Sequence, residues 1–378
     1  MADCDIPLIR SLQNKGVDVY YLLEMGADVT KGTIIDMFVG KNRNDIIPAT
    51  EYKELEIFSD YIDLSKVFVR SSYRKHKLPL IDEFCLSLKT FKFLLHHKFH
   101  VIQRTQVFFR TDVILYYFRK SLIKMVHDPF PHSGYKMRGQ TLFFYKLGLN
   151  VFKHFVILNK NQYQSFCTVY KKNPENVLLT RLGVYDCYNI YNTSSITKPN
   201  NILFFGRISK YKGVEYLCQA MNIVLKQIPD ATLTIAGGGD FYFDITGYIN
   251  NPNIEFRNRF IGVRELSDLI SSCTVVACPY TDATQSGVVM TAYSKNKPIV
   301  ATSVGGLAEQ IANGKTGLLV PPRNPNELAK ALIKILSNKN LQKEMEENIK
   351  TMKSEGDISW SSIADSYIGF YNKVLKKN

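Results

Sequence analysis

The amino-acid sequence predicts an α/β protein with parallel sheets, built in two domains. At 378 residues the chain is too long for one compact core. Short apolar runs alternate with helical patterns in its second half, which is typical of parallel strands joined by crossover helices. A polar stretch without periodicity, residues 187–200, is the best candidate for a linker. We therefore expect domains at 1–186 and 201–356, and a terminal amphipathic helix within 357–378.

The first half of the chain alternates helical and strand patterns. Helices are predicted at Ile6–Lys15, Leu80–His97 and Gln162–Tyr170, and strands at Val17–Leu23, Thr33–Val39, Val101–Phe109, His154–Leu158 and Val177–Leu182. A βαβ domain normally opens on a strand, whereas this chain opens on a helical pattern. We therefore expect the first strand to be missing, with Asp5 and its neighbours remaining from the loop that would follow it.

The second half has the more regular pattern. Strands are predicted at Ile202–Phe205, Thr232–Ala236, Ile254–Phe256, Thr274–Pro279, Ile299–Ala301 and Gly317–Val320. Helices are predicted between and after them, at Val214–Ile228, Glu265–Ser272, Val288–Ser294, Leu307–Asn313 and Asn326–Ser337. This order predicts a parallel sheet covered by helices on both faces.

Composition excludes several classes of protein. The sequence has 45% hydrophobic and 22% charged residues, as folded soluble proteins do, and no apolar run long enough to span a membrane. The N-terminus has acidic residues where a signal peptide would be basic. The seven cysteines are scattered, without CxxC or zinc spacing. These features predict a reduced, cytoplasmic protein.

Positive charge is concentrated in residues 84–172. This segment has 15 lysines and arginines but only two acidic residues, Asp112 and Asp128, interleaved with phenylalanines and tyrosines. Such a mixture favours an anionic membrane surface, and it is also compatible with a solvated basic face above an aromatic core. Nucleic-acid binding is the weakest alternative, because no nucleic-acid motif accompanies the charge. We expect a peripheral location on the inner face of the plasma membrane.

The stretch Asn201–Gln219 predicts a phosphate site. An apolar run is followed by Gly206, Arg207, Lys212 and Gly213, and then by a helical pattern. This order of strand, glycine and cation loop, and helix places backbone N–H groups and positive charge at a helix N-terminus, where phosphate binds well.

A second anion-binding element follows the strand that ends at Pro279. The polar loop TDATQSG leads into a helix, so the N–H groups of Ser286, Gly287 and Val288 are predicted to point to the carboxyl edge of the sheet. A diphosphate between these amides and the two cations, Arg207 and Lys212, would be neutralised without a metal ion. We expect no metal or other cofactor.

The stretch HDPFPHSG, residues 127–134, predicts a fixed loop after a strand in the first domain. Two prolines and a glycine exclude regular structure there. The loop carries His127, Asp128 and His132, and loops at the carboxyl ends of parallel strands are where open α/β sheets bind ligands. The histidines can equally be structural. A metal site is disfavoured, since the chain supplies no further matching ligands.

Taken in order, the motifs FFGRISKYKGVEYL, TIAGGG, QSGVVMTAYSKNKPIVAT, VGGLAEQI and GKTGLLVPP resemble glycosyltransferase family 4, retaining enzymes of the GT-B fold. The likeness covers residues 201–340, and the first half matches more loosely. It implies two Rossmann-like domains facing each other across a cleft, with a C-terminal helix that crosses back to the first domain. It also implies sugar transfer from a UDP- or GDP-sugar to a saccharide or lipid-linked acceptor in bacterial surface polysaccharide, lipopolysaccharide or glycolipid synthesis.

The resemblance assigns roles to particular residues. Arg207 and Lys212 match the cations that bind the donor diphosphate, and His127 matches a histidine beside the donor sugar. Loops at Gly237 and at Asn258, Arg259 and Phe260 match those around the nucleotide base. The acceptor side is expected to include Asp5, Asp128 and His132.

The sequence departs from the family at the E-x7-E element. Ala283 and Thr291 stand where the two glutamates that contact the donor sugar and the ribose normally lie. Thr291 is a candidate for the ribose contact, and Asp282 and Gln285 are candidates for the sugar. The sequence resembles a subgroup with this TQSGV form.

The resemblance implies front-face attack, in which the leaving phosphate accepts the proton of the acceptor, so no protein nucleophile is needed. Three alternatives stay open. They are a sugar-nucleotide epimerase or hydrolase on the same fold, a non-catalytic nucleotide-sugar-binding partner, and a basic nucleic-acid binder.

Overall fold

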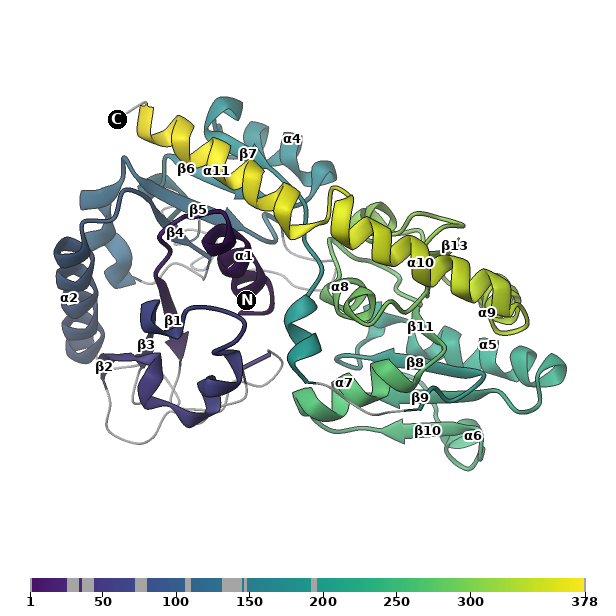
Figure 1. Ribbon diagram of the computed structural model, residues 1–378. Coiled ribbons are helices and arrows are strands. Elements are labelled where there is room, and N and C mark those ends of the chain that lie inside the picture. The colour runs from purple at the N-terminus through teal and green to yellow at the C-terminus, as the bar shows by residue number, and fades with distance from the viewer. Residues whose placement is uncertain are drawn as a thin grey trace. The chain divides into compact units, whose positions relative to one another are not determined.

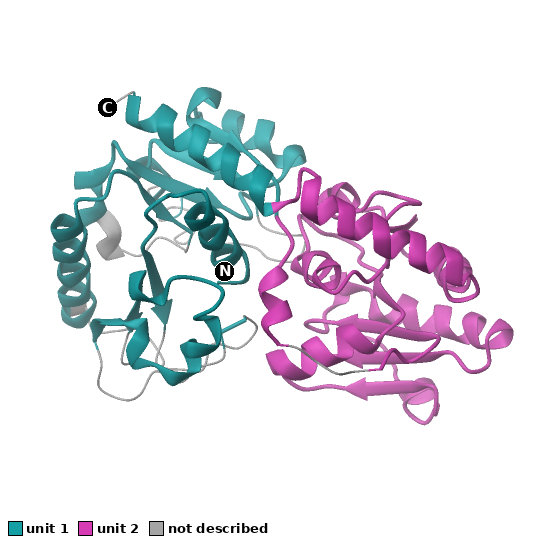
Figure 2. Ribbon diagram, viewed as in Figure 1, with its two compact units in different colours: residues 1–131, 135–182, 360–378 teal, residues 132–134, 183–359 magenta. Residues whose placement is uncertain are grey.

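The computed structural model describes residues 2–25, 34–35, 44–71, 80–105, 110–130, 145, 148–191 and 196–376. It divides into two compact units, shown in different colours in Figure 2. Unit 1 consists of residues 1–131, 135–182 and 360–378, and unit 2 of residues 132–134 and 183–359. The boundary at 182–183 precedes the expected end of the first domain at 186, and the segment expected to be a linker falls in unit 2.

Unit 2 contains a six-stranded sheet whose pairs are all parallel, as the sequence predicted (Figure 1). The strand order is β10-β9-β8-β11-β12-β13. The strands are β8 (Asn201–Phe205), β9 (Thr232–Ala236), β10 (Ile254–Arg257), β11 (Val275–Cys278), β12 (Ile299–Thr302) and β13 (Gly317–Val320). Every residue of β8, β11 and β12 is buried, which explains their continuous apolar runs.

The helices of unit 2 are α5 (Val214–Gln227), α6 (Thr246–Ile249), α7 (Val263–Ser272), α8 (Gly287–Ser294), α9 (Pro325–Leu336) and α10 (Lys339–Glu355). The helix predicted at Leu307–Asn313 is wrong. The segment forms a short 3-10 helix, Gly305–Gln310, and Ile311 is extended. The chain enters this turn at Gly305 with a positive φ of 44°, a conformation that an α-helix does not accommodate. Helix α10 lies where no element was predicted.

The described residues of unit 1 form two separate sheets. The first has the order β1-β3-β2, with β1 (Tyr21–Met25) parallel to β3 (Val67–Ser71) and β2 (Asp45–Pro48) antiparallel to it. The second has the order β4-β5-β6-β7, all parallel, with β4 (Ile102–Arg104), β5 (Leu122–Val126), β6 (His154–Ile157) and β7 (Val177–Leu179). Phe155, Phe166 and Leu122 are among the fully buried residues of the core beside the second sheet.

In the part of unit 1 that the structure describes, the helices are α1 (Ala2–Asn14), α2 (Leu80–His97), α4 (Lys160–Val169) and α11 (Trp360–Lys376). The C-terminal helix α11 packs beside α1, as Figure 1 shows. Ser11 Oγ donates a 2.8 Å hydrogen bond to the Trp360 carbonyl, and Lys15 pairs with Asp365 at 2.8 Å. The last element of the chain therefore belongs to the unit that contains the first.

Short 3-10 helices complete the chain. They are Ala49–Glu51, Lys53–Phe58, Leu64–Lys66, Arg110–Phe118, Pro174–Asn176, Asp186–Ile190, Lys210–Lys212 and Gly305–Gln310. The strand predicted at Thr33–Val39 lies mostly outside the described residues. Within the described part of the chain, no helix combines the length and the apolar character needed to cross a membrane.

Candidate functional site

The turn between β8 and α5 carries the two predicted phosphate-binding cations. Arg207 is exposed, and Lys212 ends the 3-10 turn that leads into α5. Gly213 follows with a φ of +67°, and a Cβ atom added there would lie 1.9 Å from the Pro279 carbonyl oxygen. Only glycine permits this approach, which brings the turn against the end of β11.

Lys212 has its ammonium group over an aromatic ring from the neighbouring strand end. Its Nζ lies 3.7 Å from the centroid of the Tyr280 ring and 5.2 Å from that of Tyr211. Burial lowers the pKa of Lys212 to about 8, and the positive charge of Arg207 contributes to the decrease. An anion bound here would therefore meet a cation with little competing water, a setting in which charge attraction is strong.

The N-terminus of α8 forms the facing part of the site. Helix geometry leaves the first N–H groups of α8, those of Gly287 and Val288, without intrahelical acceptors. The sequence predicts that the Ser286 N–H points to the carboxyl edge of the sheet. Instead, this N–H donates a hydrogen bond to Gln310 Oε1 at 2.8 Å. Gln310 Nε2 in turn donates to the Ser286 carbonyl at 3.2 Å. The Ser286 amide is thus already used within the protein, whereas its hydroxyl lies 3.4 Å from Tyr280 Oη.

Ala283 and Thr291, which the sequence resemblance aligns with two glutamates, lie on either side of this helix start. Thr291 is only 4% exposed, and its hydroxyl donates to the Gly287 carbonyl at 2.8 Å. Ala283 is buried, and its carbonyl oxygen would lie 1.9 Å from a Cβ atom on Gly305. Asp282 and Gln285 are half-buried in the loop between β11 and α8. The hydroxyl hydrogen of Thr291 is therefore already used in a hydrogen bond within α8.

The loops after β9 and β10 bring the predicted base-binding residues to the same edge of the sheet. Gly237 follows β9, and a Cβ atom on it would lie 2.0 Å from the Gly206 carbonyl oxygen. Asn258 Oδ1 accepts a 3.1 Å hydrogen bond from the Gly239 N–H, which links the two loops. Phe260 is 40% exposed.

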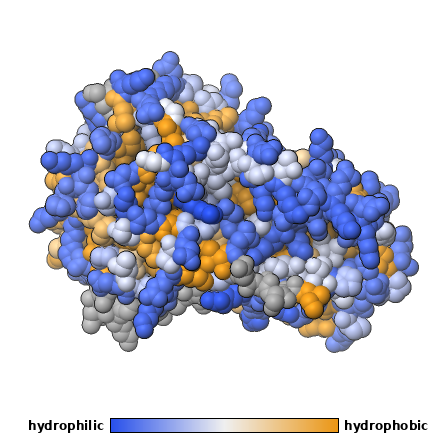
Figure 3. All heavy atoms as spheres, in the orientation of Figure 1, coloured by the Kyte–Doolittle hydropathy of each residue, from blue (hydrophilic) through white to orange (hydrophobic). Residues whose placement is uncertain are grey.

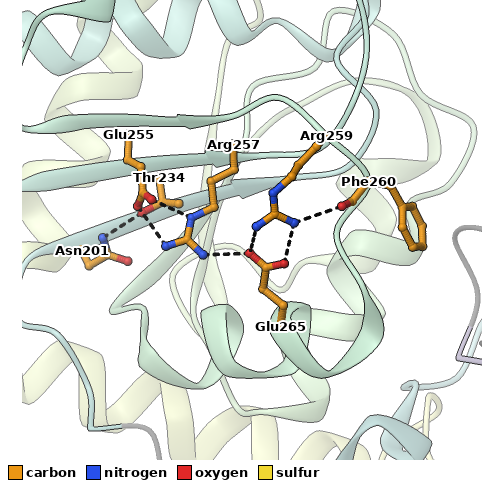
Figure 4. Close-up of polar contacts among 7 residues, drawn as sticks. All are labelled: Asn201, Thr234, Glu255, Arg257, Arg259, Phe260 and Glu265. Atoms are coloured by element: carbon orange, nitrogen blue, oxygen red, sulfur yellow. Dashed lines mark hydrogen bonds and ion pairs between the residues drawn. The ribbon is translucent and has the colours of Figure 1, made fainter.

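Ion pairs fix the shape of the loop after β10 (Figure 4). Arg259 makes a bidentate contact with Glu265, with distances of 2.6 and 2.7 Å, and Arg257 contacts the same carboxylate at 2.9 Å. These cations hold the pKa of Glu265 below its usual range. Arg259 also donates to the Phe260 carbonyl at 3.2 Å. The guanidinium of Arg259, although exposed, thus contacts both Glu265 and the Phe260 carbonyl.

Asp5, His127 and Asp128, three of the candidate residues of the first domain, lie in unit 1. His127 directly follows β5, and burial lowers its pKa to about 4, so the ring is neutral at pH 7. Its Nε2 is buried and has no hydrogen-bond partner among the described residues. Tyr170 Oη donates to the Pro129 carbonyl at 2.9 Å and so holds the start of the loop. Asp128 is exposed, and His132 lies outside the described residues.

Asp5 is a structural carboxyl group in this structure. It is 5% exposed and accepts hydrogen bonds from Tyr21 Oη at 3.3 Å and Thr105 Oγ1 at 3.1 Å. Burial raises its pKa to about 6. Its role on the acceptor side stays a prediction.

Four loops thus meet at the carboxyl edge of the unit 2 sheet, because β10, β9, β8 and β11 are consecutive neighbours. Sequence reasoning missed two of the residues that shape this edge, Tyr280 and Gln310. The aromatic residue directly after a buried strand was a usable signal for Tyr280. No sequence signal indicated Gln310, because its hydrogen-bond partner Ser286 is 24 residues away in the chain. The described residues contain no cluster of three or more His, Cys, Asp or Glu side chains suited to a metal ion.

The fold is that of the GT-B class of glycosyltransferases. A sucrose-phosphate synthase structure from Thermosynechococcus elongatus matches with a TM-score of 0.66 at 17% identity, covering 98% of this chain and 92% of that one. Anabaena Alr3699/HepE, in complex with UDP-glucose, matches with a TM-score of 0.64 at 16% identity, covering 97% and 95%.

Residues 199–338 match the family model described as "Glycosyl transferases group 1", a range that includes the four loops at the carboxyl edge of the unit 2 sheet. Among curated proteins, an uncharacterized glycosyltransferase, MJ1607, from Methanocaldococcus jannaschii is 32% identical over 178 residues, which is 46% of this chain and 45% of the relative. The chain thus spans about half the length of the curated relatives it matches.

Proposed function

We propose that this protein is a retaining glycosyltransferase that moves a sugar from a nucleotide diphosphate sugar, UDP- or GDP-linked, to a saccharide or lipid-linked acceptor. The observation that carries the proposal is the meeting of Lys212, Arg207 and the N-terminus of α8 at the edge of the unit 2 sheet. The family match and the structural neighbour bound to UDP-glucose support it.

The chemistry follows from the charge that develops when the sugar–phosphate bond breaks. The leaving diphosphate gains negative charge, and we propose that Lys212, Arg207 and the amides of Gly287 and Val288 stabilise it. Losing one such contact typically costs a few kcal/mol in the transition state, about a hundredfold or more in rate. These groups supply the neutralisation that a metal ion provides elsewhere, so we propose metal-independent transfer.

The donor sugar and ribose are proposed to be bound without the two family glutamates. Asp282 and Gln285, in the loop between β11 and α8, are the side chains that we propose for the donor sugar. His127 is proposed to lie beside the sugar as a neutral imidazole, since its pKa is lowered to about 4. A neutral imidazole can donate a hydrogen bond to a sugar hydroxyl or accept one from it. It carries no charge that would oppose the positive charge developing on the sugar ring.

The test is isothermal titration of the full chain with UDP and GDP, with and without EDTA. We expect one nucleotide to bind in an EDTA-insensitive manner, and Arg207→Ala with Lys212→Ala to weaken it at least about a hundredfold. The matched control is Lys226→Ala, which removes a charge from the last turn of the same helix α5. Equal affinity in the double variant and the control would overturn the donor site.

Turnover separates the proposed activity from its alternatives. We expect release of UDP or GDP from the nucleotide sugar to require an added saccharide or lipid acceptor. Product formed without any acceptor would favour an epimerase or hydrolase instead. Binding without turnover under any of these conditions would favour a non-catalytic partner.

We further propose that unit 1 associates with an anionic membrane surface, where surface polysaccharide, lipopolysaccharide or glycolipid is built. The support comes from the solvent side of α2. Ile81, Phe84, Leu88 and Leu95 recur there at helical spacing and are 75%, 51%, 39% and 41% exposed. A helix that is apolar on its outward face requires a partner on that face.

The surroundings of this row of side chains match a charged lipid surface. Tyr117 is 71% exposed and packs its ring against Phe91 of α2, at 5.5 Å between centroids. Exposed cations lie along the same segments, namely Lys89, Lys92, Lys98, Arg119 and Lys120. On the face that Figure 3 displays, unit 1 shows apolar patches interspersed with polar side chains. Apolar insertion together with lysines and arginines near the headgroups is how amphipathic helices bind anionic lipid.

A further inference from the structure

Helix α8 begins at a serine that does not cap it. Ser286 occupies the N-cap position with an extended backbone, at φ −133° and ψ 114°. A serine at this position usually accepts a hydrogen bond from the N–H of the second or third helical residue. Among the described residues Ser286 makes no such bond, and its hydroxyl lies 3.4 Å from Tyr280 Oη instead. The first N–H groups of the helix are therefore not satisfied by this serine.

Gln310 holds the serine from outside the helix. Its Oε1 accepts a hydrogen bond from the Ser286 N–H at 2.8 Å, and its Nε2 donates one to the Ser286 carbonyl at 3.2 Å. Ser286 is only 2% exposed, so little water competes for these two bonds. One side-chain amide thus pairs with both backbone groups of one residue, as a neighbouring strand does in a sheet. The two bonds act on the peptide groups on both sides of the Ser286 Cα and restrict both of its backbone dihedrals.

The bond to the Ser286 carbonyl also orients the N–H of Gly287. These two groups belong to the same peptide unit, and in a planar trans peptide the N–H points opposite to the C=O. Because the carbonyl faces Gln310 Nε2, the Gly287 N–H points away from Gln310. The glutamine therefore sets the direction of the first amide of the proposed diphosphate site.

The turn that carries Gln310 is itself fixed against the loop before α8. Gln310 is the last residue of the 3-10 helix Gly305–Gln310. Gly305 approaches this loop so closely that a Cβ atom on it would lie 1.9 Å from the Ala283 carbonyl oxygen. Leu307, in the middle of the turn, is fully buried. The glutamine therefore reaches Ser286 from a turn that has little freedom to move.

We propose that Gln310 is a positioning residue for the donor diphosphate. It acts through Ser286, which it keeps from capping α8, and it directs the first amides of the helix to the anion. Without the glutamine, the Ser286 hydroxyl is expected to turn to these amides and to compete with the phosphate for them. The inference rests on the proposed function, because it concerns the same diphosphate site.

The experiment compares Gln310→Met with Gln342→Met in the full chain. Both replacements keep the approximate length of the side chain and remove an amide that contacts the backbone of unit 2. Gln342 Nε2 donates to the Ile335 carbonyl at 2.7 Å and to the Leu336 carbonyl at 3.3 Å. Affinity is measured for two pairs of probes, UDP with uridine and GDP with guanosine, in which only the first member carries a diphosphate. The thermal midpoint is recorded for every variant.

We expect Gln310→Met to weaken binding of the nucleoside diphosphate at least about tenfold, because the first amides of α8 lose their direction and gain a competing acceptor. Affinity for the nucleoside should stay within about twofold, and Gln342→Met should leave both affinities within about twofold. Gln310→Asn keeps the amide but is too short to reach both backbone groups of Ser286, so it should weaken diphosphate binding roughly fivefold. This polar variant supplies the result if the methionine variant does not fold.

Equal losses for diphosphate and nucleoside, or equal losses in Gln310→Met and Gln342→Met, would show a purely structural role and overturn the inference. Unchanged diphosphate affinity in the folded Gln310 variants would overturn it and leave the proposed function intact. A wild-type chain that binds neither UDP nor GDP would overturn the proposed function itself, and this inference with it.

Discussion

Lys212 has an environment that ordinary surface lysines lack. Its ammonium group lies over the Tyr280 ring, and burial lowers its pKa from 10.5 to about 8. Between about pH 8 and pH 10.5, the Lys212 amine holds a proton in the unfolded chain but not in the folded protein. Stability of the ligand-free protein should therefore rise with pH across this interval through this group. A bound diphosphate has the opposite effect on the pKa of Lys212, because it stabilises the charged amine in the folded protein.

This reversal predicts pH-dependent donor binding. Above about pH 8 the free protein must take up a proton at Lys212 before it binds the diphosphate, so affinity for UDP should fall by up to about tenfold per pH unit. Calorimetric titration between about pH 7 and 10 measures the slope. Lys212→Arg is the matched variant, since a guanidinium keeps its charge throughout and should abolish the decline. A parallel decline in both proteins would refute the role of Lys212.

At the level of single residues, the strand, turn and helix around Arg207 and Lys212 follow from the pattern in one short stretch. The role of these two cations in phosphate binding stays a prediction. The use of the Ser286 amide by Gln310 does not follow, because it depends on the distance between two loops that are far apart in the chain. The same is true of the bidentate pairing of Arg259 with Glu265.

The connections between elements depend on a few glycines at close backbone contacts. The turn into α5 touches the end of β11 at Gly213, and Thr281 donates from its backbone to the Tyr211 carbonyl at 2.7 Å. These contacts join two loops that each carry part of the candidate site. The position of the cations relative to α8 therefore depends on the absence of a side chain at residue 213.

Gly213→Ala should accordingly destabilise the protein by at least about 2 kcal/mol, from the left-handed backbone and from the clash with the Pro279 carbonyl. Urea denaturation followed by circular dichroism measures the change. Gly247→Ala in α6 is the control, because a Cβ atom there meets nothing within 4 Å. It should leave the free energy of unfolding within about 1 kcal/mol of the original value. Similar losses in the two variants would show that the close contact at Gly213 is not important.

Element type was predictable where periodicity was strong, as in α2, whose observed bounds Leu80–His97 equal the predicted ones. It failed at Leu307–Asn313, where an apolar pattern suited an α-helix but two glycines and the contact with Ala283 impose a tighter turn. It also missed α10. That helix has few apolar residues and buries only Met345 and Ile349, so its sequence carries little periodic signal.

For the molecule as a whole, the proposed membrane face of unit 1 predicts lipid-dependent behaviour. We expect the protein to co-sediment with vesicles that contain roughly a third anionic lipid and to be released by salt, since the charged contribution is screened within about 10 Å at ordinary ionic strength. Neutral vesicles should bind it weakly. Phe84→Ser with Leu88→Ser should reduce binding about tenfold or more, because two exposed apolar side chains are lost.

A control variant distinguishes membrane binding through this face of α2 from nonspecific adsorption of exposed apolar side chains. Ile249, on α6 of unit 2, is 53% exposed, and Ile249→Ser removes a comparable apolar side chain outside unit 1. It should leave vesicle binding unchanged. Binding that ignores lipid charge, or that falls equally in both variants, would rule out α2 as the membrane face. Capture of a protein partner by α2 without lipid binding would assign the face to that partner instead.

The sequence by itself determined the α/β class, the parallel sheet of unit 2 and the glycine and cation turn between β8 and α5, because each depends on neighbouring residues and on periodicity. The tertiary structure alone decided which backbone groups of the candidate site are already paired, how far Lys212 is removed from water, and that the described strands of unit 1 form two sheets with a cavity between them. These properties arise from contacts between segments distant in the chain, and a linear pattern carries no measure of such distances.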